Sequence, residues 1–346
     1  MTADDIIPAF SVVSGAAVER ALHGRRREII DLVEHAYRLH GQGDTVNPPS
    51  YFLRFPDRPD ARIIALPASV GGDVGVDGIK WISSFPSNLA LGIPRASALL
   101  ILNDARTGVP FACLEGSIIS AVRTAASAAV AARALVAGRE APGRVGFIGA
   151  GLIARYIHAY LSELDWKVEQ YAVHDLDTGY AASFAERVLG ADGTDVRVHD
   201  SAEALIRDSD VVVLATTAAT PHLHDPALLA HNPLVLHVSL RDLGEDVVLG
   251  AANIVDDVEH VLKAGTSVHL TEQRTGHRDF IDGTLYDVLT GAVRVPVDRP
   301  VVFSPFGLGV LDLVVGAAVH RHATEHGDLT TVDGFFHELS RHGGTR

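Results

Sequence analysis

The chain has 346 residues, which predicts about two domains, because domains usually contain ~100–200 residues. Hydrophobic residues make up 47% of the chain and charged residues 21%, a composition that excludes a disordered protein. The net charge of −14 argues against nucleic acid or an anionic membrane as a partner, although a single cleft can still be positive. The only cysteine, Cys113, excludes an internal disulfide.

The first ten residues contain two acidic residues and no basic stretch before an apolar run, so we expect no signal peptide. The Ala-rich segment 117–136 carries arginines only at 123 and 133 and predicts a helix that packs closely on a neighbour, with no membrane span. We therefore expect a cytoplasmic α/β protein.

The first 137 residues predict a mixed α and β domain. Apolar residues at helical spacing predict a helix over residues 26–40. Strand-like runs separated by Gly, Pro and Asp follow it, as in an antiparallel sheet, at 50–55, 62–68, 76–83, 98–103 and 110–115.

Residues 138–303 predict a second domain with a parallel sheet, because strands and helices alternate there. The predicted strands are 144–148, 170–174, 196–199, 211–215, 234–238 and 253–255. Ser304-Pro305 predicts the start of a long helix over 306–325, with Ser as the cap and Pro at the first helical position. We expect this helix to return to the first domain, which would then comprise residues 1–137 and 304–346.

A glycine-rich motif directly follows the predicted strand 144–148. Gly149, Gly151 and Ala154 match G-x-G-x-x-A, in which the first glycine permits a tight turn, the second lets a pyrophosphate approach and the small third residue lets helix and strand pack. Asp175 ends the next strand, 24 residues after Gly151, near the offset at which an acid binds the ribose of NAD. These features predict a Rossmann domain that binds NAD.

The same motif predicts which other residues bind the cofactor. Leu152 and Ile153 belong to the motif itself and precede the helix predicted over 154–164, whose N-terminus would point at the phosphates. Thr216, directly after the strand 211–215, is a further expected cofactor-binding residue. No Arg or Lys lies between residues 175 and 185, which favours NAD over NADP.

Three basic residues before the glycine motif are unusual. Lys80 lies within an otherwise apolar strand, although such a lysine is often a snorkelling edge residue. Arg95 lies in a loop before a strand. Arg123 is the only charge near the start of the Ala-rich helix, where it would be costly without an anion to bind.

These segments resemble the ornithine cyclodeaminase/mu-crystallin family over about residues 51–316. The resemblance is carried by Lys80 with Asn88, by the segments 123–126 and 149–154, and by Ser239-Leu240-Arg241-Asp242. It implies a Rossmann domain joined to a substrate-binding and dimerisation domain, a homodimer, and hydride transfer between an amino-acid carbon and a nicotinamide.

The resemblance also implies roles for individual residues. Lys80 matches the family's active-site lysine and Asp242 its catalytic aspartate, which we expect to handle proton transfers. Arg123 and Arg54 match arginines that bind substrate carboxylates. Arg95 departs from the cyclodeaminase pattern, which has a threonine there, and a cation at this position would repel the ammonium of ornithine.

Arginines at 54, 95 and 123 would instead suit a substrate with several carboxylates, each bound as a bidentate pair. Segments 62–68, 81–86 and 278–281 resemble the family branch that oxidises N-((2S)-2-amino-2-carboxyethyl)-L-glutamate. The resemblance therefore implies NAD-dependent cleavage of that compound to L-2,3-diaminopropionate and 2-oxoglutarate, for siderophore or nonribosomal peptide biosynthesis.

Three alternatives stay open at this point: an ornithine cyclodeaminase, another amino-acid dehydrogenase or ketimine reductase of the family, and a nicotinamide-binding protein without catalysis. Of these, Arg95 argues against the first, and the combination of Lys80, Arg123 and Asp242 argues against the last. His222 and His224 lack further converging ligands, so we expect no metal site.

Overall fold

The computed structural model describes residues 9–336, and the expectations for residues 1–8 and 337–346 lie outside that range. The chain divides into two compact units. The first comprises Met1–Gly24, Gly43–Ser120 and Gly309–Arg346, and the second Arg25–Gln42 and Ala121–Leu308.

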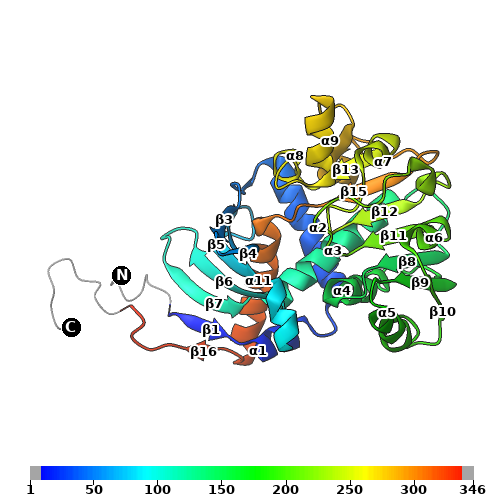
Figure 1. Cartoon of the computed structure of the whole chain (residues 1–346). Helices are drawn as coiled ribbons and strands as arrows, with labels where there is room; N and C mark the ends of the chain where they lie inside the picture. The colour runs from blue at the N-terminus through cyan, green and yellow to red at the C-terminus, as the bar shows by residue number, and fades with distance from the viewer. Residues whose placement is uncertain (1–8, 337–346) are drawn as a thin grey trace. The chain divides into compact units, whose positions relative to one another are not determined.

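The first unit is built on a mainly antiparallel sheet. Strands β3 to β7 pair with one another in antiparallel order, and β1 adds parallel to β7 (Figure 1). All five strand-like runs expected between residues 50 and 115 are present. The elements of this unit are β1 (Ser11–Val13), α1 (Gly15–Leu22), β2 (Thr45–Val46), β3 (Tyr51–Phe55), β4 (Arg58–Val70), β5 (Val76–Ser84), η2 (Pro86–Leu91), β6 (Ala96–Asp104), β7 (Pro110–Glu115), α11 (Gly309–His326) and β16 (Thr330–Thr331).

Helix α11 packs on one face of this sheet, against β4, β5 and β6. A glycine allows the close approach, since a Cβ at Gly316 would lie 2.2 Å from Cδ2 of Leu100. The helix is buried along most of its length, which fits its apolar sequence. Helix α11 therefore belongs to the first unit.

The start of that helix differs from the expectation. Ser304 is the buried last residue of β15 (Val301–Ser304), and α11 begins five residues later at Gly309. Ser304 therefore caps no helix, and its hydroxyl lies 3.2 Å from Nδ1 of His237. The backbone amides of Phe306 and Gly307 bind the carboxylate of Asp256, which holds this segment out of a helix.

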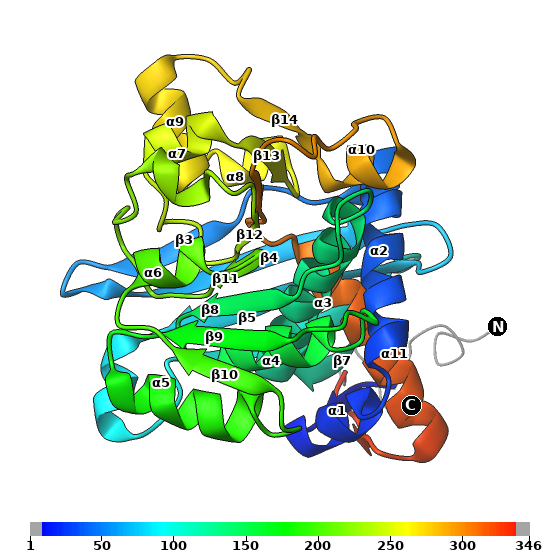
Figure 2. The ribbon, with the colours of Figure 1, turned by 90° about the vertical axis from the view of Figure 1, so that its right-hand side faces the viewer.

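The second unit is built on an eight-stranded parallel sheet in the order β10-β9-β8-β11-β12-β15-β13-β14 (Figure 2). Its first five strands have the Rossmann order, in which the chain reverses direction across the sheet between β8 and β11. The strands are β8 (Arg144–Ile148), β9 (Gln170–His174), β10 (Asp195–Val198), β11 (Val211–Leu214), β12 (Leu234–His237), β13 (Ala252–Val255), β14 (Ile281–Thr284) and β15.

Helices cover both faces of this sheet. Leu205 and Val248, from α6 and α7, pack in one core with Ile148 and Val212. On the other face Phe147 lies against aromatic rings that include Phe184 of α5. The helical segments are α2 (Arg26–Gln42), α3 (Ser117–Leu135), α4 (Leu152–Leu161), α5 (Thr178–Phe184), η3 (Ala185–Leu189), α6 (Ala202–Arg207), η4 (Pro226–Leu229), α7 (Glu245–Gly250), α8 (Val258–Val261), α9 (Ser267–Thr275) and α10 (Leu285–Thr290).

The second unit also takes in α2 and most of α3, which the boundaries expected from the sequence placed in the first domain. The physical reason is that α2 packs against α10 and α4 of this unit and is joined to α3 by a hydrogen bond. The hydroxyls of Tyr37 on α2 and Ser127 on α3 form a buried hydrogen bond of 2.7 Å. Both helices are largely buried along their apolar faces.

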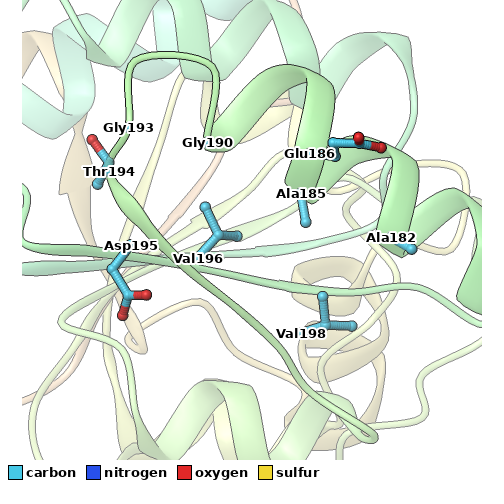
Figure 3. A pocket seen from close by; sticks show the side chains of 9 residues that line it. All are labelled: Ala182, Ala185, Glu186, Gly190, Gly193, Thr194, Asp195, Val196 and Val198. Atoms are coloured by element: carbon cyan, nitrogen blue, oxygen red, sulfur yellow. The ribbon is translucent and has the colours of Figure 1, made fainter.

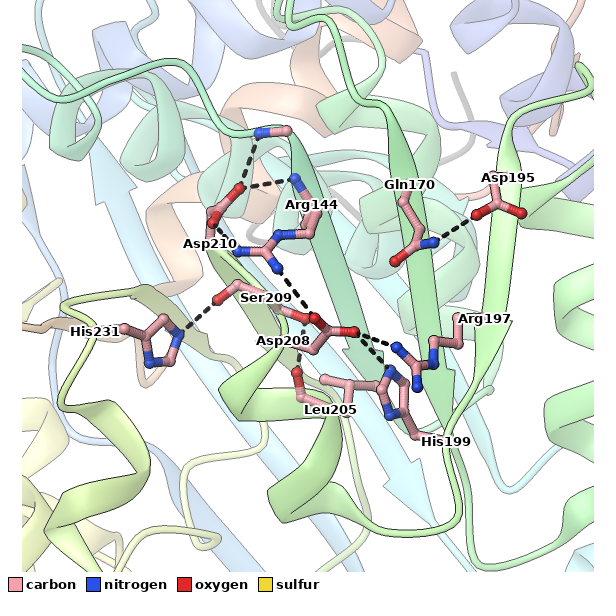
Figure 4. Close-up of polar contacts among 11 residues, drawn as sticks. Arg144, Gln170, Asp195, Arg197, His199, Leu205, Asp208, Ser209, Asp210 and His231 are labelled. Carbon is pink, nitrogen blue, oxygen red and sulfur yellow. Dashed lines mark hydrogen bonds and ion pairs between the residues drawn. The ribbon is translucent and has the colours of Figure 1, made fainter.

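A network of charged residues links β8, β10 and the turn before β11 (Figure 4). Arg144, the first residue of β8, binds Asp208 at 3.0 Å and Asp210 at 3.2 Å. Asp208 also binds Arg197 of β10 at 3.0 Å. Of these groups, Arg144 and Asp210 lie at the amino ends of β8 and β11, opposite to the carboxyl ends where ligands bind in parallel α/β sheets.

Candidate functional site

The glycine loop lies at the carboxyl end of β8, at the switch point of the parallel sheet. Gly149 has φ +96°, a left-handed conformation that favours glycine. A Cβ at this residue would lie 2.5 Å from the carbonyl oxygen of Ala215, at the end of the neighbouring strand. Gly149 is therefore required both by the turn and by the close approach of two chain segments.

Gly151, unlike Gly149, has open space where a Cβ would lie. It precedes the first residue of α4, and no side chain forms a capping hydrogen bond there. A Cβ at Gly151 would meet no atom within 4 Å among the described residues. Free space in front of a helix N-terminus, where backbone N–H groups point outward, suits a phosphate.

Asp175 lies beside this loop, at the end of β9. One of its carboxylate oxygens accepts a hydrogen bond from the backbone N–H of Ala150 (2.8 Å), and the other accepts one from Asp177 (2.9 Å). Asp175 therefore shapes the glycine loop. The position also matches that of an acid which binds a ribose hydroxyl in dinucleotide sites. Together with Gly149 and Gly151, it fits a bound dinucleotide.

Asp242 lies in the loop after β12 and is fully buried. Its carboxylate accepts hydrogen bonds from the hydroxyls of Thr216 and Ser239, the second at 2.5 Å. The carboxylate also lies 3.2 Å from Nε2 of His237. Leu240 within the same loop has φ +71°, a strained conformation for leucine that is held in place by its surroundings.

The contacts of Asp242 determine its charge. Burial raises the pKa of this carboxyl, but the contacts with His237, Ser239 and Thr216 outweigh burial and bring the pKa to about 2. Asp242 is therefore ionised at neutral pH. Thr216, which the sequence predicts to bind the cofactor, has its hydroxyl directed to Asp242, so these two predicted residues lie together at the carboxyl ends of β11 and β12.

Lys80 lies in the middle of β5 and is 2% exposed. Its ammonium lies 2.7 Å from the carboxylate of Asp312 on α11, and it donates to the hydroxyl of Ser120 at 3.1 Å. Asp312 is fully buried. Lys80 is therefore no snorkelling edge residue, because its charge lies inside the first unit next to an opposite charge.

Arg54 and Arg95 belong to the same unit and have neutral partners. Arg95 donates to the hydroxyl of Ser84 at 2.8 Å, and the guanidinium of Arg54 lies over the ring of Phe52. Within the described residues neither forms an ion pair, whereas Arg58 on the same sheet pairs with a carboxylate.

The register of the strands relates these residues to one another. Arg54 lies opposite Arg62, and Arg62 lies opposite Ser84, so all three share one face of the sheet. Lys80 is on that face too, since side chains alternate along a strand. The structure thus gathers three of the predicted site residues, Lys80, Arg54 and Arg95, on one face of the first unit.

Arg123 belongs to the second unit, on α3. Its guanidinium lies beside the backbone of Gly307, where a Cβ would be 2.6 Å from Nη1. The second unit therefore holds Arg123, Asp242 and the predicted cofactor-binding residues.

A separate shallow surface depression of about 660 Å³ lies between β10 and the segment formed by α5 and η3 (Figure 3). It is lined by small and apolar side chains such as Ala182 and Val198, and by Glu186 and Asp195. None of the predicted site residues lines this depression.

Between residues 9 and 336, no group of three or more His, Cys, Asp or Glu side chains could hold a metal ion. In the same range one helix, α3, is long and apolar enough to span a membrane by length and composition alone. Two thirds of its most apolar window (67%) is buried inside the protein, as in the core helix of a folded domain.

The strand order, the glycine loop and Asp175 define a protein with a Rossmann-type dinucleotide-binding unit. The chain belongs to the ornithine cyclodeaminase/mu-crystallin family, whose model matches residues 12–327. It is 30% identical to the nodulation efficiency protein NfeD of Rhizobium meliloti, over 88% of this chain and 92% of that protein.

Two further comparisons concern proteins of stated activity. The chain is 26% identical to N-((2S)-2-amino-2-carboxyethyl)-L-glutamate dehydrogenase of Staphylococcus aureus, over 91% of this chain and 96% of that enzyme. The structure of Δ1-pyrroline-2-carboxylate reductase of Thermococcus litoralis, in complex with NADH and L-proline, matches with a TM-score of 0.86 and 26% identity. That match covers 93% of this chain and all of the other.

Sequence reasoning missed several residues of the site. Asp312 was not singled out, although it is the only acid in a long apolar stretch of α11, and a lone charge there is itself a signal. Ser239 belongs to the motif 239–242, but the sequence predicts no role for it. The contact of His237 with Asp242 had no signal in the sequence, because it arises from the path of the loop after β12.

Proposed function

We propose that the protein is an NAD-dependent oxidoreductase that cleaves the secondary amine N-((2S)-2-amino-2-carboxyethyl)-L-glutamate to L-2,3-diaminopropionate and 2-oxoglutarate. Gly149, Gly151, Leu152 and Ile153 would hold the pyrophosphate, and Asp175 the ribose. NAD bound there supplies the acceptor for a hydride.

The observation that carries the choice of substrate is the state of Arg54 and Arg95. In the described structure the guanidinium of each arginine contacts only neutral groups. Arg54 is aligned across the strands, through Arg62, with Ser84, which binds Arg95. Ser84 is two strands away from Arg54, about 10 Å at the usual strand spacing. Two such cations suit a substrate that presents more than one carboxylate.

Arg123 would bind a further carboxylate, so each of the three arginines would take one of the substrate's three. Ornithine, which has one carboxylate and an additional ammonium, suits this set poorly because Arg95 would repel the ammonium. A monocarboxylate such as alanine would leave two of the arginines without a partner.

The proposed reaction begins with loss of hydride from the α-carbon of the glutamate moiety, which leaves a cationic imine. Water adds to that carbon, and the resulting carbinolamine breaks its C–N bond. The nitrogen keeps the electron pair and takes a proton, so the products are a ketone and a primary amine. One NAD is reduced, one water consumed and one proton released in each turnover.

Asp242 is assigned to the proton transfers. Because its pKa is about 2, the carboxylate is ionised and stabilises the positive charge that forms at the imine. Water that has just added to a cationic imine carries a strongly acidic proton, which even a weakly basic carboxylate can accept. Lys80, whose ammonium lies 2.7 Å from the carboxylate of Asp312, is assigned to hold a substrate carboxylate or to polarise the water.

The similarity to the dehydrogenase of Staphylococcus aureus supports this substrate, and the similarity to a reductase bound to NADH supports the cofactor. We further propose that the protein is a cytoplasmic homodimer. Its product would feed siderophore or nonribosomal peptide biosynthesis, since diaminopropionate is a precursor of such compounds.

The test is to incubate the protein and NAD with the glutamate–diaminopropionate conjugate, L-ornithine or L-alanine, and to identify the products. We expect L-2,3-diaminopropionate and 2-oxoglutarate from the conjugate. Proline and ammonia from ornithine without net NADH would instead establish a cyclodeaminase. Binding of NADH without turnover of any substrate would establish a non-catalytic nicotinamide-binding protein.

A further inference from the structure

Asp256 is a buried carboxylate at the end of β13 that takes no part in the proposed reaction. It is 3% exposed, and it accepts hydrogen bonds from the backbone N–H groups of Phe306 (2.9 Å) and Gly307 (2.7 Å). It also accepts one from the backbone of its neighbour Asp257. Asp256 therefore fixes the short segment between β15 and α11.

Gly307, in that segment, is in direct contact with Arg123. Its φ is +95°, and a Cβ there would lie 2.6 Å from Nη1 and 3.1 Å from Nη2 of Arg123. The guanidinium thus fills the space that any other side chain at residue 307 would need. By contrast, Gly291 in the same unit has φ +78° but would meet no described atom within 4 Å.

The charges of Asp256 and Arg123 also act on a common neighbour, Tyr37. The Tyr37 hydroxyl, which bonds to Ser127 on α3, has its pKa raised chiefly by burial and also by the charge of Asp256, whereas the charge of Arg123 lowers it. The carboxylate of Asp256 and the guanidinium of Arg123 therefore act on one buried hydroxyl of the second unit.

The strand end that carries Asp256 is itself fixed. Asp257 follows it, and the carboxylate of Asp257 lies 3.2 Å from Nε2 of His40 on α2 and 2.8 Å from Nδ1 of His260 on α8. These contacts tie the end of β13 to two helices of the same unit. The end of β13 that carries Asp256 is therefore bonded to α2 and α8.

We propose that Asp256 and Gly307 are positioning residues that form a cradle for Arg123 and set the direction in which its guanidinium meets a substrate carboxylate. Asp256 fixes the path of the backbone, and the missing side chain of Gly307 leaves the guanidinium its place. This inference rests on the proposed role of Arg123 in substrate binding.

The test compares Gly307→Ala with Gly291→Ala. Both replace a glycine with positive φ, so both carry similar backbone strain, but only the first displaces Arg123. We expect Gly307→Ala to raise KM for the glutamate–diaminopropionate conjugate about 10-fold or more, as for loss of a charge-assisted hydrogen bond. The Kd for NADH should change less than about twofold, and Gly291→Ala should leave both constants unchanged.

Arg123→Gln and the double variant Arg123→Gln/Gly307→Ala separate this inference from the proposed function. If the cradle acts through Arg123, the double variant has the KM of Arg123→Gln alone. If the effects of the two substitutions on KM are additive, the cradle is overturned and the role of Arg123 stands. The same conclusion holds if Gly307→Ala has the KM of Gly291→Ala while Arg123→Gln raises KM. An Arg123→Gln variant with unchanged KM would overturn the proposed role of Arg123 and the cradle with it.

If Gly307→Ala does not fold, it will not bind NADH, and a second variant then tests the cradle. Asp256→Asn keeps the size of the side chain but points an amide donor at backbone N–H groups. We expect it to raise KM for the conjugate in the same way, with NADH binding kept. An unchanged KM in this variant would contradict the cradle.

Discussion

At the residue scale, Lys80 and Asp312 form a buried ion pair, with the two side chains 2% and 0% exposed. Breaking a buried pair leaves an uncompensated charge, which is costly. We predict that Asp312→Asn lowers the free energy of unfolding by about 3–5 kcal/mol. The double variant Lys80→Met/Asp312→Leu should recover at least half of that loss, because it buries no lone charge. Urea unfolding measures both, and a loss below about 1 kcal/mol for the single variant would be typical only of an exposed pair.

Asp242 gives a prediction on pH. Its folded pKa of about 2 lies below the ordinary 3.8, so it stabilises the protein above pH ~4, and this contribution disappears as the pH falls toward 2. The contribution is about 2 kcal/mol at neutral pH. We predict that Asp242→Asn makes the stability less dependent on pH between 4 and 2 and lowers kcat by ~10²–10⁴, while NADH still binds. A variant that retained more than about a tenth of the wild-type rate would disprove the assigned role.

At the scale of elements, the two glycines of the loop between β8 and α4 have separable roles. A Cβ at Gly149 would collide with the carbonyl of Ala215, whereas a Cβ at Gly151 would enter open space. We predict that Gly149→Ala lowers the melting temperature and that Gly151→Ala leaves it within about 2 °C, while weakening NADH binding at least about 10-fold. Calorimetry with each variant, free and with NADH, checks this. Normal NADH affinity in folded Gly151→Ala would place the pyrophosphate elsewhere.

The elements also show what the sequence can and cannot predict. Alternating and periodic patterns predicted β3 to β13 to within a few residues, because each segment's own side chains decide which face is buried. The strands β1, β2, β14, β15 and β16 were not predicted. The helix start predicted at Ser304-Pro305 was wrong, since the same pair of residues also suits the end of a strand. Here the distant Asp256 binds the following amides and decides the outcome. Asp312 lies 232 residues from Lys80, so no local pattern could pair them.

At the scale of the whole molecule, an apolar row crosses the face of the antiparallel sheet opposite to Lys80. Tyr51, Ala65, Trp81 and Leu99 are paired in register across β3 to β6, and Trp81 and Leu99 are 42% and 49% exposed. An apolar patch of this kind is typical of an interface. We predict that Trp81→Asp converts the proposed homodimer to a folded monomer in sedimentation velocity. A wild-type monomer, or a variant that stays dimeric, would show that this face is not the interface.

We propose that basic side chains of an acidic protein select a substrate with three carboxylates, and that NAD is the oxidant of its secondary amine. This proposal is tested most directly by the stoichiometry of NADH and 2-oxoglutarate formed from N-((2S)-2-amino-2-carboxyethyl)-L-glutamate, with L-alanine and L-ornithine in parallel. We predict one NADH for each 2-oxoglutarate from the conjugate, at a kcat/KM at least about 100-fold above that of either amino acid. A higher kcat/KM for alanine or ornithine, or no 2-oxoglutarate from the conjugate, would contradict it.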